Sequence, residues 1–224
     1  MAVWLVRVER WTGPVEEFVE RPVPDRLAAV EVWICEPRRP VLALGSTQRT
    51  DVADLAVASE GGVDVVRRRS GGGAVFLAPG RSLWLDVLLP RGDSRWLDDI
   101  SLSGHWLGER WRESLKRFGV DADVYRSGLE RTEWGRLVCF AALGPGEVTI
   151  AGRKAVGIAQ RRTRAGARFQ CLVLADWNPR DVLDLLAMDN TERERAAAEL
   201  SGVATGAGVP LDALEHEFLT LIRK

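Results

Sequence analysis

The chain of 224 residues has a formal net charge of −1, with 46% apolar and 28% charged residues. This composition is ordinary for a folded globular protein. The near-zero charge gives no electrostatic reason to expect nucleic acid or a membrane surface as a partner. The opening run MAVWLVRVERW is short and contains arginines, so it predicts neither a signal peptide nor a membrane span, and we expect a cytoplasmic protein.

Cysteine and histidine are scarce in this sequence. Cys35, Cys139 and Cys171 lie far apart without CxxC spacing, which indicates neither a disulfide scaffold nor a structural zinc site. His105 and His216 both fall in helix-like segments. We therefore expect no metal site and no catalytic histidine.

The first third of the sequence alternates between strand-like runs and turns. Short apolar and β-branched segments bounded by proline or glycine predict strands, and one intervening segment predicts a short helix. The expected strands are residues 3–8, 28–35, 41–44, 63–67, 74–77 and 82–89, and the expected helix is residues 51–60.

The middle of the chain changes to a helical period. Ile100, Leu107, Trp111, Leu115 and Phe118 are spaced so that they share one face of a helix. This stripe predicts a helix within residues 94–118 that packs against the core.

The rest of the chain returns to short strands and ends in helices. Strands interleaved with a few helices, without regular βαβ alternation, predict an α+β fold with a mixed sheet, and size statistics predict one domain over residues 1–224. Thr191 and Glu194 predict a capping box at one helix start, and residues 202–208 are the one candidate linker. The expected strands are 136–140, 147–150, 155–160 and 169–174, and the expected helices are 182–188, 191–200 and 211–222.

The most informative segment is RRRSGGGAV, residues 67–75. Three successive glycines are costly to order and have no side chains to pack, so they need a backbone reason. Close approach of a ligand is one such reason, because amide N–H groups and neighbouring arginines can bind a phosphate or a carboxylate. A glycine-rich hairpin turn is the alternative. The segment fits neither a P-loop nor a dinucleotide fingerprint.

A second segment, GRKAVGIAQRRTR at residues 152–164, contains Lys154. Lysine is rare here, because all but three of the 31 basic residues are arginine. A lysine between apolar and glycine positions could reach into a pocket and contact an acyl carbonyl or a phosphate oxygen. A solvent-exposed turn is the alternative. The arginines that follow, including Arg161 and Arg168, suit a solvated loop, or an acidic partner or triphosphate.

Cys139 lies fifteen residues before Lys154. A thiol close to an ammonium and to arginines can supply a thiolate nucleophile. On the local sequence, a buried strand cysteine is an equal alternative. Cys35 and Cys171 are interpreted as buried apolar residues.

Together these segments resemble the lipoate-protein ligase and octanoyltransferase family, whose catalytic domains share the biotin-protein ligase fold. RRRSGGGAVF resembles the family's Arg-Arg-x-Ser-Gly-Gly-Gly-Ala-Val block, and GRKAVGIAQRR resembles its Gly-Arg-Lys-x-x-Gly-Ser-Ala block. Trp33, Gly45 and Gln48 resemble upstream family positions. The resemblance covers roughly residues 33–174.

The resemblance implies a mixed, largely antiparallel sheet packed with helices, in one catalytic domain without a large C-terminal accessory domain. It implies that Lys154, and in one branch Cys139, act on the acyl group. The residues implied to bind the acyl chain and the adenylate are Arg68, Ser70, Gly71, Gly72, Gly73, Ala74, Gly157 and Gln160.

The sequence departs from the ligase pattern at two places. Leu77 and Ala78 stand where ligases usually carry His-Asp, and Gln170 and Cys171 stand where they carry His-Gly. Conversely, Cys139 followed by phenylalanine resembles the nucleophile position of a cysteine-dependent branch of octanoyltransferases.

Two enzymatic mechanisms and one binding function are therefore open. A ligase would use ATP and Mg²⁺ to convert lipoate or octanoate into an acyl-adenylate before transfer to a lysine, and the sequence favours this reading slightly. A transferase would take an octanoyl group from acyl carrier protein onto Cys139 and needs no cofactor. The expected acceptor is a lipoyl domain of a 2-oxoacid dehydrogenase or a glycine cleavage protein. A non-catalytic acyl-binding protein is the third alternative, and biotin ligation is disfavoured because the glycine pattern differs.

Overall fold

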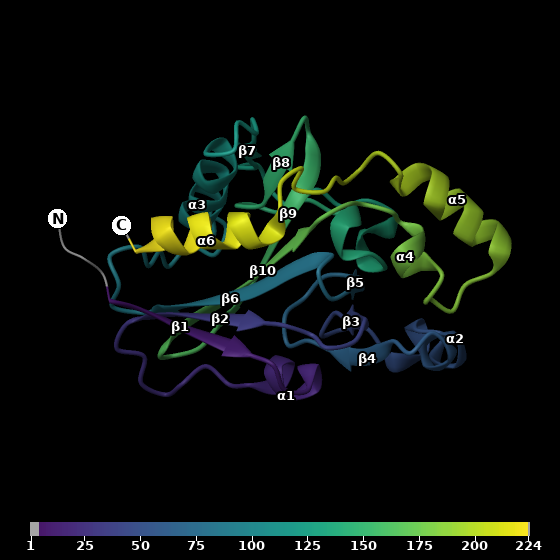
Figure 1. Ribbon diagram of the computed structural model, residues 1–224, viewed down its shortest axis with the longest axis horizontal. Coiled ribbons are helices and arrows are strands. Elements are labelled where there is room, and N and C mark those ends of the chain that lie inside the picture. The colour runs from purple at the N-terminus through teal and green to yellow at the C-terminus, as the bar shows by residue number, and fades with distance from the viewer. Residues whose placement is uncertain (1–4, 224) are drawn as a thin grey trace.

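The computed structural model describes residues 5–223 and contains two β-sheets surrounded by helices (Figure 1). The larger sheet has seven strands in the order β1-β2-β6-β10-β9-β8-β7, and the smaller has three in the order β4-β3-β5. The strands of the larger sheet are β1 (Val6–Trp11), β2 (Val30–Cys35), β6 (Ser82–Pro90), β7 (Asp123–Val124), β8 (Val148–Ile150), β9 (Arg153–Arg162) and β10 (Gly166–Leu174). Those of the smaller sheet are β3 (Val41–Leu44), β4 (Asp64–Arg67) and β5 (Val75–Leu77).

The larger sheet is antiparallel except for its β1–β2 pair, which is parallel. The prediction of a mixed, largely antiparallel sheet is therefore confirmed. Its centre consists of the three longest strands, β6, β10 and β9. Strand β10 is buried at every position, as expected for a strand covered on both faces.

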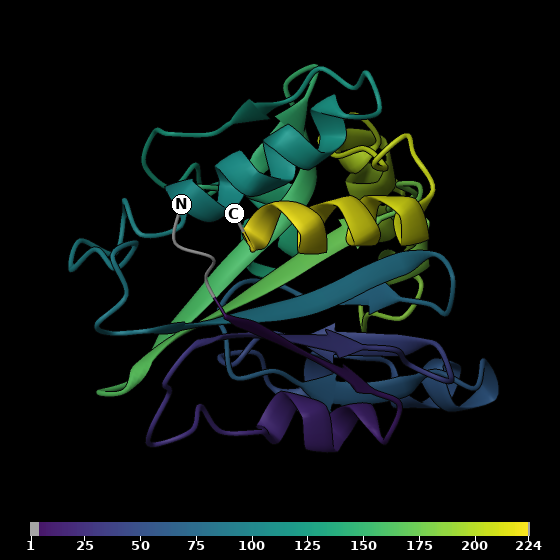
Figure 2. The ribbon, with the colours of Figure 1, turned by 60° about the vertical axis from the view of Figure 1, so that its left-hand side comes forward.

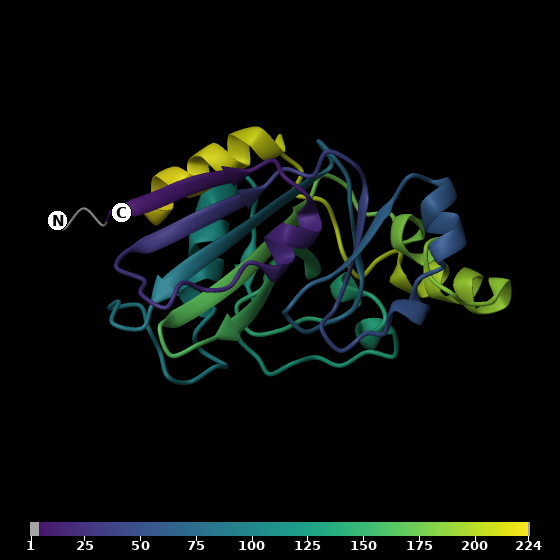
Figure 3. The same ribbon diagram turned by 90° about the horizontal axis from the view of Figure 1, so that it is seen from below.

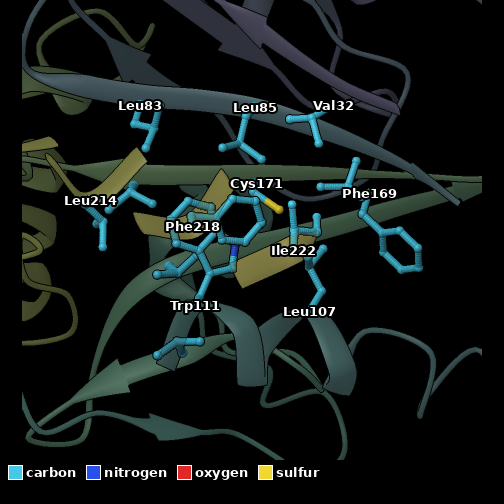
Figure 4. Close-up of a cluster of buried hydrophobic side chains, with 14 of the residues drawn as sticks. Val32, Leu83, Leu85, Leu107, Trp111, Phe169, Cys171, Leu214, Phe218 and Ile222 are labelled. Atoms are coloured by element: carbon cyan, nitrogen blue, oxygen red, sulfur yellow. The ribbon is translucent and has the colours of Figure 1, made fainter. Parts of the chain in front are cut away.

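Side chains of β10 alternate between two hydrophobic cores. Phe169 and Cys171 face helices α3 (His105–Lys116) and α6 (Leu211–Ile222), which lie across one face of the sheet (Figure 2). In this core the rings of Trp111 and Phe218 stack with centroids 4.0 Å apart (Figure 4). Leu172 points to the opposite face, where the functional segments lie.

That opposite face is covered by the smaller sheet and by helix α1 (Val15–Glu20), which is seen against the strands from below (Figure 3). Three further helices, α2 (Leu55–Glu60), α4 (Arg180–Leu183) and α5 (Asn190–Leu200), surround the smaller sheet. The glycine-rich segment joins β4 to β5 of the smaller sheet, and its Arg68 lines a pocket together with Trp84 and Gly157 of the larger sheet. Within residues 5–223 no helix combines the length and the apolar composition needed to cross a membrane.

The central helix is shorter than the sequence predicts. It begins at His105 rather than near residue 94, because Asp99 accepts hydrogen bonds from the backbone and hydroxyl of Ser101 and holds that stretch in turns. Ile100 is 61% exposed and so does not belong to the stripe, whereas Trp111 is fully buried.

The predicted strand at 136–140 is wrong. The segment forms two short 3-10 turns, Trp134–Arg136 and Cys139–Ala141. Between these turns, Val138 forms an isolated β-bridge with Ala74 of the glycine segment. Hydrogen bonds from Ala74 N to Leu137 O and from Cys139 N to Ala74 O make this bridge. The segment therefore follows the glycine turn instead of joining either sheet.

Two smaller expectations in the last third of the chain are also wrong. Asp189, not Thr191, caps α5 by accepting from the amide of Glu192. Residues 202–208 are packed and not a linker, since Ala204 bridges to Lys154. Helix α1 was not predicted, and the first residues of the expected strand at 3–8 lie outside the described part of the chain.

Candidate active site

The glycine segment is held by close contacts between backbones. A Cβ on Gly73 would lie 2.4 Å from the amide nitrogen of Val138, and one on Gly45 would lie 1.8 Å from the carbonyl oxygen of Gly72. Gly72 also has a φ of +95°, which disfavours any residue with a side chain. These close approaches explain why glycine is needed at these positions. They also place the glycine turn against the segment that carries Cys139.

Arg68 organises this turn from the inside. Its side chain is only 2% exposed. Nη1 donates to Ser70 Oγ and to Gly71 O, both at 2.6 Å, and Nη2 donates to Gly73 O at 2.8 Å. The same Nη2 lies 3.5 Å from the sulfur of Cys139. Arg68 thus fixes the glycine turn and brings positive charge to the thiol.

A second link passes through Gln48, a family position upstream. Its Oε1 accepts from Gly45 N at 2.8 Å, and its Nε2 donates to the carbonyls of Arg136 and Leu137 at 3.1 Å. The Gln48 amide therefore joins the loop after β3 to the segment that precedes Cys139.

Lys154 is buried behind the cysteine. Its ammonium donates to Cys139 O at 3.0 Å and to Ala142 O at 2.9 Å, and it pairs with Glu147 Oε1 at 2.8 Å. Three donors therefore meet three acceptors, which is the full capacity of an ammonium. Lys154 holds the Cys139 turn in place instead of pointing into open space.

Glu147 completes this arrangement. Besides the ion pair, its Oε1 accepts from Ile158 N at 3.0 Å and its Oε2 accepts from Gly144 N at 2.7 Å. The carboxylate therefore connects β9 to the turn that follows Cys139. Glu147 was not predicted as a site residue, because its partners are distributed over several segments of the chain.

A narrow pocket lies between the Cys139 turn and the face of the larger sheet. It contains about 270 Å³ of empty space, part of which is open to solvent. Its lining residues are Arg68, Trp84, Cys139, Glu147, Gly157, Ile158, Ala159, Gln170 and Leu172.

The predicted site residues take up different places around this pocket. Arg68, Cys139 and Gly157 line it, and Ser70, Gly71, Gly72, Gly73 and Ala74 form the turn beside it. Gln160 does not line the pocket. Its Oε1 accepts a hydrogen bond from Ser103 Oγ, and its Nε2 donates one to Ile100 O.

Arg168 does not belong to a solvated loop. It is 3% exposed, pairs with the fully buried Asp86, and donates to the carbonyls of Arg21 and Phe18. Burial raises the pKa of Asp86, against the opposing effect of Arg168 and of a hydrogen bond from Trp84. The prediction of a solvated loop is wrong for Arg168 because its partners lie on β6, in α1 and just after α1, far from it in the sequence. Exposed Arg161, in contrast, approaches the carbonyl of Arg69 beside the pocket.

Comparison with known proteins identifies the family. The family model described as the lipoyl protein ligase A/B catalytic domain matches residues 17–205. The chain belongs to this family.

Relatives of this lipoyl protein ligase A/B domain include two curated octanoyltransferases named LipM. That of Exiguobacterium sp. is 28% identical over 168 residues, which cover 71% of this chain and 59% of the relative. That of Staphylococcus epidermidis is 24% identical over 210 residues, which cover 91% of this chain and 73% of the relative. The chain thus spans less than two thirds of the length of the first relative.

Solved structures share the fold of the domain. A bipartite lipoate protein ligase from Thermoplasma acidophilum superimposes with a TM-score of 0.73 at 17% identity, covering 97% of this chain and 81% of that one. A lipoate-protein ligase A bound with ATP gives 0.70 at 16% identity, covering 97% and 83%. At these identities the likeness establishes the fold alone.

Proposed function

We propose that the protein is an acyltransferase that moves an octanoyl or lipoyl group to a lysine of an acceptor domain through a thioester on Cys139. The observation that carries this proposal is the position of the thiol. Cys139 is half-buried, lines the pocket, and has its sulfur 3.5 Å from Nη2 of Arg68. The names of the two LipM relatives agree with it.

In the first half-reaction, Sγ of Cys139 attacks the carbonyl carbon of an acyl thioester on a carrier protein. The bond from the carbonyl carbon to the carrier sulfur breaks, and the carrier thiol leaves with the proton that the Cys139 thiol releases. The carbonyl oxygen carries negative charge in the transition state. Gly71 and Gly72 are exposed, and their amide N–H groups donate to no acceptor within residues 5–223, so they are available to stabilise that oxygen.

In the second half-reaction, the neutral amine of the acceptor lysine attacks the same carbonyl carbon. A C–N bond forms, the C–S bond to Cys139 breaks, and the proton lost from nitrogen returns to sulfur or passes to solvent. Negative charge that develops on the departing sulfur is stabilised by the adjacent Arg68 guanidinium.

Lys154 acts as a positioning residue in this reaction and does not contact the acyl group. All three of its N–H donors are engaged by the Cys139 turn and by Glu147. We infer that the buried ion pair of Lys154 and Glu147 fixes the position of the Cys139 thiol relative to the pocket. The sequence alone suggested that Lys154 contacts the acyl group directly.

The charge at the rim of the pocket indicates what kind of protein partner binds there. Arg69 and Arg161 are exposed beside it, and neither has an ion-pair partner in the described part of the chain. Two guanidinium groups without ion-pair partners favour an acidic partner surface, such as a carrier protein or a lipoyl acceptor domain. We further propose that residues 1–224 act as one catalytic domain.

The ligase mechanism is the second candidate. It is favoured by the free amides of Gly71 and Gly72, which could also hold a phosphate. Mg²⁺ usually binds through one or two carboxylates together with substrate phosphates, and Glu147 is the carboxylate at the pocket, although it already pairs with Lys154. The transferase is preferred because ligation through an adenylate needs no thiol at the position of Cys139.

The deciding experiment compares two donors for one acceptor domain. Octanoyl carrier protein without ATP should support acceptor modification by the wild-type protein, and Cys139→Ser should abolish it. Free octanoate with ATP and Mg²⁺ should give none. Modification that requires ATP and survives Cys139→Ser would establish the ligase, and acyl binding without turnover from either donor would indicate a binding protein.

A further inference from the structure

An apolar cluster is exposed on the loop between β6 and α3. Its members Leu97, Ile100 and Leu102 are 45%, 61% and 45% exposed. No other stretch of six residues within the described chain exposes three large apolar side chains. The loop, residues 91–104, contains neither helix nor strand and is longer than most connections. A long loop that exposes apolar side chains together is typical of a binding surface.

Two side chains of β9 hold this loop in place. Arg162 Nη2 donates to the carbonyl oxygen of Leu97 at 2.6 Å. Gln160 Nε2 donates to the carbonyl oxygen of Ile100 at 2.8 Å, and Gln160 Oε1 accepts from the hydroxyl of the buried Ser103 at 2.8 Å. The apolar cluster is therefore exposed although its backbone is tied to the sheet. Gln160, predicted as a substrate-binding residue, shapes this loop instead.

A basic row runs from the pocket rim to the same loop. It consists of Arg91, Arg161 and Arg164, which are exposed and form no ion pair with another residue of the described chain. Arg161 Nη1 lies 3.5 Å from the carbonyl oxygen of Arg69 at the rim. Arg164 lies in the turn between β9 and β10, and the amide of Arg91 donates to the neighbouring Ala165 O at 3.0 Å. The loop and this hairpin lie side by side (Figures 2 and 3).

The acidic residues of the loop do not cancel this positive charge. Residues 91–104 and 157–166 together carry five arginines and three aspartates. One aspartate, Asp93, is already paired with Arg95 at 2.7 Å. An apolar centre with a positive margin suits a partner surface that has acidic side chains around exposed apolar ones.

The separation between loop and pocket favours the carrier protein over the acceptor domain. Strand β9 lines the pocket at Gly157 and holds the loop at Arg162. Five residues of strand span roughly 17 Å, at about 3.3 Å per residue. An extended lysine side chain spans only roughly 6 Å, so an acceptor has to bring its lysine directly over the thiol. A carrier holds its thioester on a long flexible prosthetic arm, so its body can dock at a distance from the thiol.

We propose that loop 91–104 and the β9–β10 turn form the docking face for the acyl-loaded carrier protein. The apolar cluster contacts the centre of the carrier's surface, and the basic row pairs with its acidic side chains. This inference rests on the proposed acyl transfer and names the partner that supplies the acyl group. The space directly over the Cys139 thiol is left for the lysine of the acceptor domain.

The test measures KM for octanoyl carrier protein, for the acceptor domain and for an octanoyl thioester of a small thiol. Two double variants of the full-length protein are compared with wild type: Leu97→Ser with Ile100→Ser, and Arg91→Glu with Arg164→Glu. Each should raise KM for octanoyl carrier protein about tenfold and leave the other two KM values unchanged. The effect of the arginine pair should shrink at high salt, because salt screens exposed charges.

Matched controls lie elsewhere on the surface. Leu55→Ser changes a side chain that is 52% exposed on α2, and Arg7→Glu changes an exposed arginine on β1, at the far edge of the larger sheet. Both should behave as wild type, and thermal melting checks that every variant is folded.

Calorimetric titration of octanoyl carrier protein into Cys139→Ser protein gives a readout independent of turnover, and each double variant in that background should lower the affinity about tenfold. An unchanged carrier KM and affinity in either folded double variant would overturn the inference. So would an equal rise in KM for the acceptor domain, or an equal effect of the matched controls. If wild type transfers no acyl group, the proposed function fails, and a carrier affinity that both double variants reduce would still support the docking face.

Discussion

Replacing Lys154 by methionine removes the ammonium from three buried acceptors. The side chains of Lys154 and Glu147 are 4% and 9% exposed, so solvent does little to screen their pair. Removing one partner of a buried ion pair costs about 3–5 kcal/mol, because the other charge is left uncompensated. With a urea m-value of about 2 kcal/mol per molar, a loss of about 4 kcal/mol lowers the unfolding midpoint by about 2 M.

The assay is urea unfolding of wild type, Lys154→Met, Glu147→Gln and the double variant at neutral pH. The double variant should be less destabilised than the sum of the single ones, by a coupling free energy of about 2 kcal/mol. Lys116→Met is the matched control, because Lys116 is exposed near the end of α3 and should cost no more than about 0.5 kcal/mol. Equal losses for Lys154→Met and Lys116→Met, or strict additivity of the pair, would refute the reasoning.

Two further predictions concern the glycine turn and the rim of the pocket. Gly45→Ala should lose at least about 3 kcal/mol, because its Cβ would lie 1.8 Å from the Gly72 carbonyl oxygen, whereas Gly71→Ala, with no atom within 4 Å, should change the unfolding free energy by less than about 0.5 kcal/mol. Thermal melting measures both, and a native-like Gly45→Ala would contradict the packing of the turn. Arg69→Glu combined with Arg161→Glu should raise KM for a carrier-bound thioester about tenfold at low salt, while leaving KM for a small-molecule thioester unchanged. Steady-state kinetics at two salt concentrations tests this, and an equal rise for both substrates would show that the rim acts on the pocket and not on the carrier.

Local sequence patterns predicted the central strands well. The run at 82–89 is almost entirely apolar and forms β6, one of the three central strands of the larger sheet, because an apolar run of that length bounded by turns suits a strand buried on both faces. The three glycines in a row predicted a segment whose backbone is closely approached, with a hairpin turn as the alternative, and the structure shows other backbone segments of the chain packed against it. These features depend on residues adjacent in sequence.

Features that depend on distant partners were not predictable. The segment containing Cys139 reads as a strand, but its hydrogen-bond partner is the glycine turn and it bends with that turn. Arg168 reads as a surface charge, but Asp86 lies on β6, the strand next to β10 in the same sheet, and accepts its hydrogen bond. Glu147 carries no local signal at all. In each case the decisive contact lies many residues away along the chain.

The most direct measurement is the intact mass of the protein after a single turnover with octanoyl carrier protein and no acceptor. The account predicts one octanoyl adduct, mapped to Cys139 and released by hydroxylamine. Cys35 and Cys171 should stay unmodified, because both are buried and burial raises the pKa of each thiol. No adduct on Cys139 under conditions that modify an acceptor domain would contradict the account.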